Sequence, residues 1–425
     1  MKLTGTICPP GDKSISHRIA LISLISKGKS VVKNFSTARD CKTSLTAVRD
    51  LGVPIEEIPG AILIEGVDRD ISSKCYLDCQ NSGTTMRLLM GILSANRGEF
   101  LLDGDTSLRN RPMERVAIPL RAMGANITCS PSGTPPVRIV GGTLNGIDYE
   151  LPTPSAQLKS AIIFAGMQAR GKTNIIERTT SRDHTEILLR NCGANIEKTP
   201  LGWAVSRSVP TLPAEYYVPG DISSAFFFIC AATILQGSDI KVEKVLLNPT
   251  RIGALRVLQR MGASIQSTVE MNSNNTSTGS FGEVYGDIQA KFIGELKSFE
   301  VSTEETPLLV DEVPILALVA TQAKGTSIFH DVSELRIKES DRVQAIMTQL
   351  NSMGAQIEAC GNSLLIHGPT RLLAKQTMES FADHRIAMTL KIAGLLSDSF
   401  PTIRDQDCIA ISYPNFDETL RSLAT

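Results

Sequence analysis

Positively charged residues recur where small polar residues open an apolar helical stretch. The free N–H groups and the dipole at a helix start favour phosphate or carboxylate there. With a net charge of only -1, the chain must bind anions by local placement of Lys and Arg. A solvated or capping role is the alternative for any single one, but the set indicates a site for a polyanion. The cations near the starts of these apolar stretches are Lys13, Arg18, Arg87, Lys159 and Arg385. Further cations precede or begin the next helical stretch along the chain, and these are Arg111, Arg182, Lys338 and Arg342.

Carboxylates stand among these cations. They are Asp311, Glu312, Glu339, Asp341 and Asp383. Glu339 lies between Lys338 and Arg342, and such neighbouring charges tune the pKa of an acid or base. The cluster therefore suits proton transfer as well as binding, with ordinary ion pairs on a helix surface as the alternative.

An internal repeat must position these residues. Five helical stretches end in a Gly followed, three positions on, by Ile, with the glycines at Gly52, Gly124, Gly193, Gly262 and Gly354. A glycine there suits the left-handed cap of a helix, and the Ile begins a strand. Helix openings recur with a similar period near residues 13, 82, 155, 222, 311 and 383. Six units of two helices and several strands follow, and the polar stretch 271–282 is predicted to be an inserted surface loop.

Three units per domain give two similar α/β domains. We expect the chain to cross between them near residues 12 and 222, so that residues 1–12 and 222–425 form one domain and residues 13–221 the other. The last unit ends after its second helix, residues 417–424, and lacks a closing strand. The strand-like segment 1–8 can supply it, so the two termini are predicted to share a domain.

Composition limits the class of protein. The chain has 425 residues, of which 42% are hydrophobic and 20% charged, as in a soluble protein with a full core. The near-zero net charge gives no general attraction to nucleic acid or membrane. Residues 1–14 lack the apolar core of a signal peptide, and the longest apolar run, 225–235, is predicted to be a buried helix. The nine scattered cysteines favour reduced thiols in a cytoplasmic protein rather than a metal site.

Several motifs, taken together, resemble those of one enzyme family. They are Pro10-Gly-Asp-Lys-Ser-Ile-Ser-His-Arg18, Asn81-Ser-Gly-Thr84 with Arg87, Arg111-Pro112, Ser155-Ala-Gln157, Leu335-Arg-Ile-Lys-Glu-Ser-Asp-Arg342 and Asp383-His-Arg385. In this combination and order the chain resembles the 5-enolpyruvylshikimate-3-phosphate synthase family, in its second, largely bacterial class. The resemblance implies two hinged domains of three βαβαββ repeats each, an inside-out α/β barrel arrangement, with the active site in the cleft between them.

The resemblance also implies an activity and roles for residues. The enolpyruvyl group of phosphoenolpyruvate would pass to the 5-hydroxyl of shikimate-3-phosphate, with release of phosphate and without metal or organic cofactor. The acceptor's carboxylate would be held by Ser14 and Arg18, and its 3-phosphate by Ser155, Ala156, Gln157 and Arg182. Its 5-hydroxyl would meet Asp311 and Lys338. We expect a cytoplasmic monomer with these small molecules as its only partners.

Phosphoenolpyruvate would use a second set of residues. Its phosphate would be held by Lys13, Arg111 and the backbone of Gly83, with Asn81 and Thr84 in the same motif, and its carboxylate by Arg342 and Arg385. The candidates for acid and base are Lys13, Asp311 and Glu339, and the order in which they act stays open.

Departures from the family pattern also carry information. Ile411-Ser-Tyr-Pro414 lacks the lysine usual before this segment in the first class, and Ala156 replaces a serine of that class. Gly83 keeps the glycine whose replacement by alanine accompanies glyphosate tolerance, so steric exclusion of glyphosate is not expected at this position.

Two other functions fit these motifs less well. A UDP-N-acetylglucosamine enolpyruvyl transferase typically has a cysteine just before its Arg-Pro motif, whereas residues 101–111 contain none, and Ser14 stands where that family has asparagine. A non-enzymatic anion-binding protein would not need Lys13, Asp311 and Glu339 together with the arginines.

Overall fold

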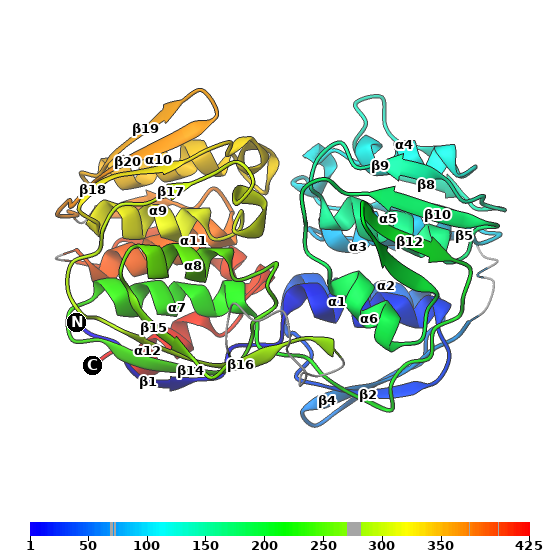
Figure 1. Ribbon diagram of the computed structural model, residues 1–425, viewed down its shortest axis with the longest axis horizontal. Coiled ribbons are helices and arrows are strands. Elements are labelled where there is room, and N and C mark those ends of the chain that lie inside the picture. The colour runs from blue at the N-terminus through cyan, green and yellow to red at the C-terminus, as the bar shows by residue number, and fades with distance from the viewer. Residues whose placement is uncertain (69–70, 72–73, 270–281, 374, 398) are drawn as a thin grey trace. The chain divides into compact units, whose positions relative to one another are not determined.

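The computed structural model describes residues 1–68, 71, 74–269, 282–373, 375–397 and 399–425 (Figure 1). The chain divides into two compact units. The terminal unit contains residues 1–10, 219–277 and 284–425, and the central unit contains residues 11–218 and 278–283. Most of the predicted surface loop 271–282 lies outside the described residues.

These boundaries differ from the expected ones at a few residues. Gly11 and Asp12 belong to the central unit, and residues 219–221 to the terminal unit. Glu283, expected in the first domain, also belongs to the central unit, because its carboxylate lies 2.7 Å from Nδ1 of the buried His184. The contact joins residues 99 positions apart, so no local sequence pattern indicates it.

The central unit repeats one sheet three times. In each sheet the first two strands are parallel and the other two antiparallel, as expected for strand–helix–strand–helix–strand–strand order. The sheets are β13(Glu215–Tyr217)-β2(Lys29–Lys33)-β4(Ala61–Glu65)-β3(Ile55–Ile58), β5(Lys74–Asp78)-β6(Glu99–Asp103)-β8(Val137–Val140)-β7(Asn126–Thr128) and β9(Asp148–Glu150)-β10(Lys172–Ile176)-β12(Gly202–Ser206)-β11(Ile196–Thr199). The helices are α1(Lys13–Ile22), α2(Arg39–Asp50), α3(Gly83–Leu93), α4(Glu114–Ala122), α5(Ala156–Gly166) and α6(His184–Asn191).

The terminal unit repeats the same pattern, with its last repeat shortened. Its sheets are β1(Thr4–Ile7)-β14(Asp239–Leu246)-β16(Tyr285–Lys291)-β15(Ser264–Ser267), β17(Glu300–Val301)-β18(Gly325–Phe329)-β20(Ser363–Gly368)-β19(Gln356–Cys360) and the pair β21(Thr377–Glu379)-β22(Thr402–Arg404). Its helices are α7(Ile222–Ile234), α8(Gly253–Arg260), α9(Val313–Gln322), α10(Arg342–Ser352), α11(His384–Leu395) and α12(Phe416–Leu423). Short 3-10 helices add residues 23–25, 108–110, 306–308, 333–337 and 406–411.

The N-terminal strand has a different role from the expected one. β1 pairs in parallel with β14 along residues 4–7 and so begins the first repeat of the terminal unit. Next to β1, an isolated bridge between Leu3 and Ala424 connects the N-terminal segment to the end of the last repeat. The two termini still lie together, since the N–H of Lys2 donates to the carbonyl of Thr425 and the N–H of Thr425 to that of Lys2 (Figure 1).

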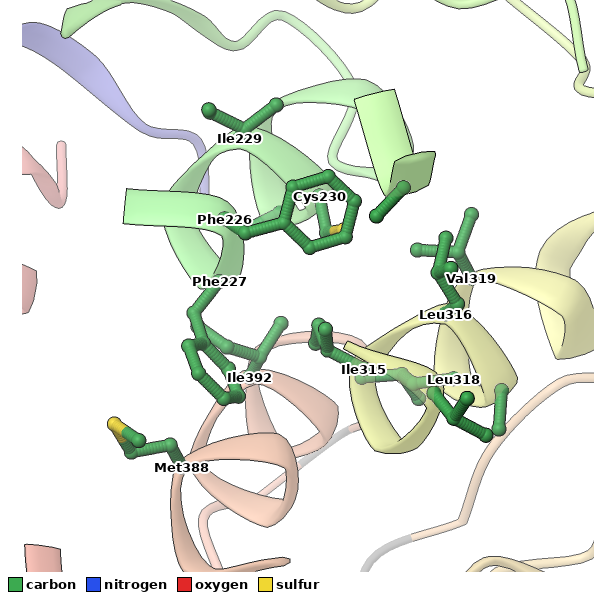
Figure 2. Packing of buried hydrophobic residues seen from close by; sticks show 14 of the residues in the cluster. Phe226, Phe227, Ile229, Cys230, Ile315, Leu316, Leu318, Val319, Met388 and Ile392 are labelled. Carbon is green, nitrogen blue, oxygen red and sulfur yellow. The ribbon is translucent and has the colours of Figure 1, made fainter. Parts of the chain in front are cut away.

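The first helices of the repeats form the cores. Residues 222–233 of α7 are all buried, which confirms the predicted buried helix, because a helix that is apolar all round must be enclosed. Figure 2 shows side chains of α7, such as Phe226 and Phe227, beside Ile315 and Leu316 of α9 and Ile392 of α11. No helix among the described residues is long and apolar enough to cross a membrane. All nine cysteines are free thiols.

Both sequence signatures of the repeat have the predicted geometry. The helix-ending glycines at 52, 124, 193, 262 and 354 have φ values from 76° to 102°. Five of the six first helices begin with a side-chain cap, from Asp12, Ser82, Ser155, Asp221 and Asp383. The exception is α9, where the side chain of Glu312 makes no cap hydrogen bond and a proline stands in the first turn. Proline is well tolerated there, because the N–H group that it lacks would have no partner within the helix.

Gly193 allows a direct test of why glycine ends these helices. A Cβ atom there would meet nothing within 4 Å, yet φ is 76°, so Gly193→Ala should lose about 1 kcal/mol of unfolding free energy through backbone strain alone. Gly142 is the matched control, because its surroundings are equally open and its φ lies outside the left-handed region. Urea unfolding would measure both variants, and equal stabilities would contradict the conformational explanation.

Candidate active site

The start of α3 brings several predicted residues together. Arg111, which precedes α4, donates from Nη1 to the carbonyl of Asn81 at 3.2 Å and from Nη2 to its Oδ1 at 2.7 Å. Gly83 is the first residue of α3, and a Cβ atom added there would lie 3.1 Å from Nη1 of Arg87 and 3.5 Å from Nη1 of Arg111. Two guanidinium groups therefore flank a helix start whose first residue has no side chain.

Gln157 links this group to the start of α5. Its Oε1 accepts from Nη1 of Arg87 at 2.6 Å, and its Nε2 donates to Oγ1 of Thr84 at 2.9 Å. Ser155 caps α5, with its Oγ accepting from the N–H of Leu158. The predicted residues of the second and third repeats thus form one hydrogen-bonded group. Arg87, a helix-start cation, holds Gln157 in place.

Arg18 is almost fully buried and donates hydrogen bonds to three groups. Its Nε donates to Oγ1 of Thr185 at 2.6 Å, its Nη1 to the carbonyl of Ser14 at 2.9 Å, and its Nη2 to Oγ of Ser160 at 3.0 Å. These three contacts orient the guanidinium, a group whose planar fork matches a carboxylate.

Lys13, the first residue of α1, is held by a carboxylate that the sequence analysis missed. Its Nζ lies 3.1 Å from Oδ2 of Asp40, in the first turn of α2. Lys13 is half-buried. The pair fixes the direction of the ammonium group while leaving part of it exposed.

Lys159 requires a correction, because it does not serve as an anion-binding cation. The side chain is fully buried, with its Nζ 2.9 Å from both oxygens of Glu177 and 2.8 Å from Oε1 of Glu186. Burial alone would lower the pKa of Lys159, but the carboxylates of Glu186 and Glu177 outweigh it and raise that pKa. Its charge is therefore used within the protein. Arg182, also predicted, is half-buried in the loop before α6.

In the terminal unit, Arg342 contacts the two carboxylates that were predicted to act as acid or base, Asp311 and Glu339. It is the first residue of α10 and is buried. Its guanidinium lies 2.7 Å from Oε2 of Glu339, 3.3 Å from Oδ1 of Asp311 and 2.9 Å from Oδ2 of Asp383. Burial opposes its charge, but Asp383, Glu339 and Asp311 together raise its pKa. Asp383, which the sequence indicated only as one of several carboxylates, is the fully buried partner of Arg342.

Arg385 lies one residue into α11. Its N–H donates to Oδ1 of Asp383 at 2.9 Å and its Nη1 to the carbonyl of Ser223 at 3.1 Å. Arg251, which no motif indicated, donates to Oγ of the same Ser223 at 2.8 Å. The internal repeat contained a signal for Arg251, because Arg251 precedes α8 in the same way as Arg111 precedes α4.

Lys338 follows the short helix at residues 333–337 and stands close to these groups. Burial lowers its pKa, the carboxylate of Asp311 opposes that shift, and the charge of Arg342 adds to it. An amine with a lowered pKa is more readily deprotonated near neutral pH than an ordinary lysine. Lys338 is therefore suited to exchange a proton with a hydroxyl group.

Comparison with known proteins identifies the family. Residues 1–420 match the family of EPSP synthase (3-phosphoshikimate 1-carboxyvinyltransferase). The chain belongs to this family. Similar EPSP synthase relatives, each named 3-phosphoshikimate 1-carboxyvinyltransferase, come from Thermodesulfovibrio yellowstonii, at 43% identity, and Bacillus velezensis, at 41%, and each alignment covers 99% of this chain and 97% of the relative.

Solved structures agree with the family and with the predicted fold. EPSP synthase from Acinetobacter baumannii matches with a TM-score of 0.84 and 38% identity, over 100% of this chain and 96% of that one. The enolpyruvyl transferase NikO from Streptomyces tendae matches with a TM-score of 0.77 over 99% of this chain and 95% of that one. At 17% identity, that likeness shows the fold alone, and it confirms the predicted enolpyruvyl transferase fold.

Substitution of Asp383 tests whether this carboxylate stabilises the buried Arg342 in the terminal unit. Asp383→Asn keeps the shape but leaves Arg342 without its most buried counter-charge, so unfolding free energy should fall by about 3 kcal/mol. Glu379→Gln is the control, because Glu379 and Arg404 form an ion pair 2.9 Å long on the surface of the same unit, and its change should stay below about 0.5 kcal/mol. Chemical denaturation measures both, and equal losses would contradict the anchoring role of Asp383.

Proposed function

We propose that the protein transfers the enolpyruvyl group of phosphoenolpyruvate to the 5-hydroxyl of shikimate-3-phosphate and releases phosphate. The observation that carries the proposal is the family match over residues 1–420. The hydrogen-bonded groups around Gly83 and Arg342 support it, because both contain residues that the motifs assign to two doubly acidic substrates.

In this proposal the central unit binds shikimate-3-phosphate. Ser14 and Arg18 take its carboxylate, and the three hydrogen bonds that orient the Arg18 guanidinium support that role. The 3-phosphate is bound by the start of α5 and by the loop before α6, through Ser155, the N–H of Ala156, Gln157 and Arg182. A capped helix start with its N–H groups directed outward is a favourable phosphate site.

Phosphoenolpyruvate requires residues of both units. Its phosphate goes to Lys13, Arg111 and the N–H of Gly83, with Asn81 and Thr84 holding the surrounding side chains. Its carboxylate goes to Arg342 and Arg385, since guanidinium groups match planar carboxylates better than ammonium groups. The proposal therefore requires residues of both units to act on one pair of substrates.

The reaction then proceeds by addition and elimination. Carbon 3 of phosphoenolpyruvate gains a proton, and the oxygen of the 5-hydroxyl forms a bond to carbon 2 as it loses its own proton. The tetrahedral adduct next breaks its bond to the phosphate oxygen, and the new methyl group returns a proton. Lys13, Asp311 and Glu339 are the proposed acids and bases, and Asp311 with Lys338 contacts the hydroxyl. Arg342 lies within hydrogen-bonding distance of both carboxylates, those of Asp311 and Glu339.

We also propose that the enzyme works in the cytoplasm as a monomer, with no nucleic-acid or membrane partner. The net charge of -1 supports the last part, because it gives no general attraction to polyanions. Light scattering of the purified protein would measure its mass directly.

An acceptor assay tests the activity. With phosphoenolpyruvate present, phosphate release should require shikimate-3-phosphate, and UDP-N-acetylglucosamine in its place should give no release. Turnover with the nucleotide sugar alone would overturn the proposal. Ligand binding by calorimetry without any turnover would instead favour an anion-binding protein.

Glu339→Gln separates catalysis from binding. Glutamine can keep the contact to Arg342 but cannot exchange a proton, so kcat should fall by about two orders of magnitude or more, with KM values changed by less than about threefold. Steady-state kinetics measures both constants. A rise in KM with kcat preserved would make Glu339 a positioning residue.

A further inference from the structure

The buried ammonium of Lys159 joins three elements of the central unit. Lys159 lies on the second turn of α5, Glu177 follows β10, and Glu186 belongs to α6. All three side chains are almost completely buried. One cation therefore holds two carboxylates from separate elements, and we name these three residues the Lys159 clip.

One arm of the clip fixes the loop that leads to Arg182. Oε1 of Glu177 accepts from both the N–H of Ser181, at 2.9 Å, and its Oγ, at 2.6 Å. Ser181 is buried and directly precedes Arg182. The loop is thus tied through Glu177 to the same helix whose start carries Ser155 and Gln157.

The other arm fixes the groups that orient Arg18. Ser160 follows Lys159 on α5, and Thr185 precedes Glu186 on α6. The hydroxyls of Ser160 and Thr185 lie 2.6 Å apart, and both accept from Arg18. Lys159 and Glu186 thus join α5 and α6 next to the two hydroxyls that accept from Arg18.

We propose that the Lys159 clip is a positioning device that preforms both ends of the shikimate-3-phosphate subsite. Lys159 itself contacts no substrate. It holds the carboxylate-binding Arg18 and the phosphate-binding loop at a fixed separation before the acceptor arrives, which removes an ordering cost from binding. The inference rests on the proposed function and adds to it which buried residues set acceptor affinity.

A double variant separates positioning from simple stability. Lys159→Met alone leaves two buried carboxylates unpaired and can prevent folding. Lys159→Met with Glu186→Met replaces that ion pair by apolar side chains of similar length, an exchange that buried ion pairs often tolerate, and Glu177 keeps its hydrogen bonds from Ser181. Lys172→Met is the matched control, because Lys172 and Glu197 form an exposed ion pair in the same unit.

The kinetic readout compares the two substrates. In the folded double variant, KM for shikimate-3-phosphate should rise by about tenfold or more, while KM for phosphoenolpyruvate and kcat change by less than about threefold. The control should match the parent. A folded double variant with an unchanged KM for the acceptor, or with equal rises for both substrates, would overturn the proposal.

A second readout does not depend on activity. The Ser181 amide should exchange with solvent about tenfold faster or more in the double variant, because Glu177 is no longer held to α5, while amides within α3 stay protected. Unchanged exchange at Ser181 would refute the clip even in an active enzyme. If the parent releases no phosphate from the two substrates, the proposed function fails, and the exchange measurement still decides whether the clip holds the loop.

Discussion

A buried charge needs a counter-charge or a dense set of hydrogen-bond partners, because its desolvation is otherwise strongly unfavourable. This constraint determines what each buried cation of the protein can do. Lys159 is surrounded by two glutamates and is a structural residue. Arg18 donates to two hydroxyls and a carbonyl, which fix the direction of its guanidinium group. Arg342 is compensated by three carboxylates, and it keeps those acids in a defined place.

The repeat makes this arrangement possible. Each first helix is enclosed by its unit, so its side chains form the core while its start carries polar groups. A cap such as Ser155 satisfies one N–H group of the first turn, and other N–H groups at a helix start can bind a ligand. Duplicating the module multiplies helix starts of the same design, and differences in the residue after each cap give them different partners.

The sequence predicted well whatever depends on local chemistry. The caps, the left-handed glycines and the buried helix near residue 225 follow from residues within a few positions of one another, and the structure has them where they were expected. The neighbourhood of Arg342 and Glu339 was also predicted, because both belong to one motif. What failed depends on distant partners. The glutamates of Lys159 come from another strand end and another helix, Asp40 from a second helix, and the pairing of β1 with β14 from opposite ends of a long stretch of chain. No local pattern distinguishes a cation that will meet two carboxylates from one that will meet a ligand.

The pairing of β1 with β14 has a consequence for synthesis on the ribosome. The central unit is almost continuous in sequence, and its first sheet is completed when β13 emerges, whereas β1 must wait for a partner strand made more than two hundred residues later. The nascent chain therefore carries an unpaired strand at its front while the middle of the protein folds, and such edges can associate with other chains. His184 likewise stays without its carboxylate partner until Glu283 is made. The central unit is thus expected to form first, with its final contact supplied from within the half that folds last.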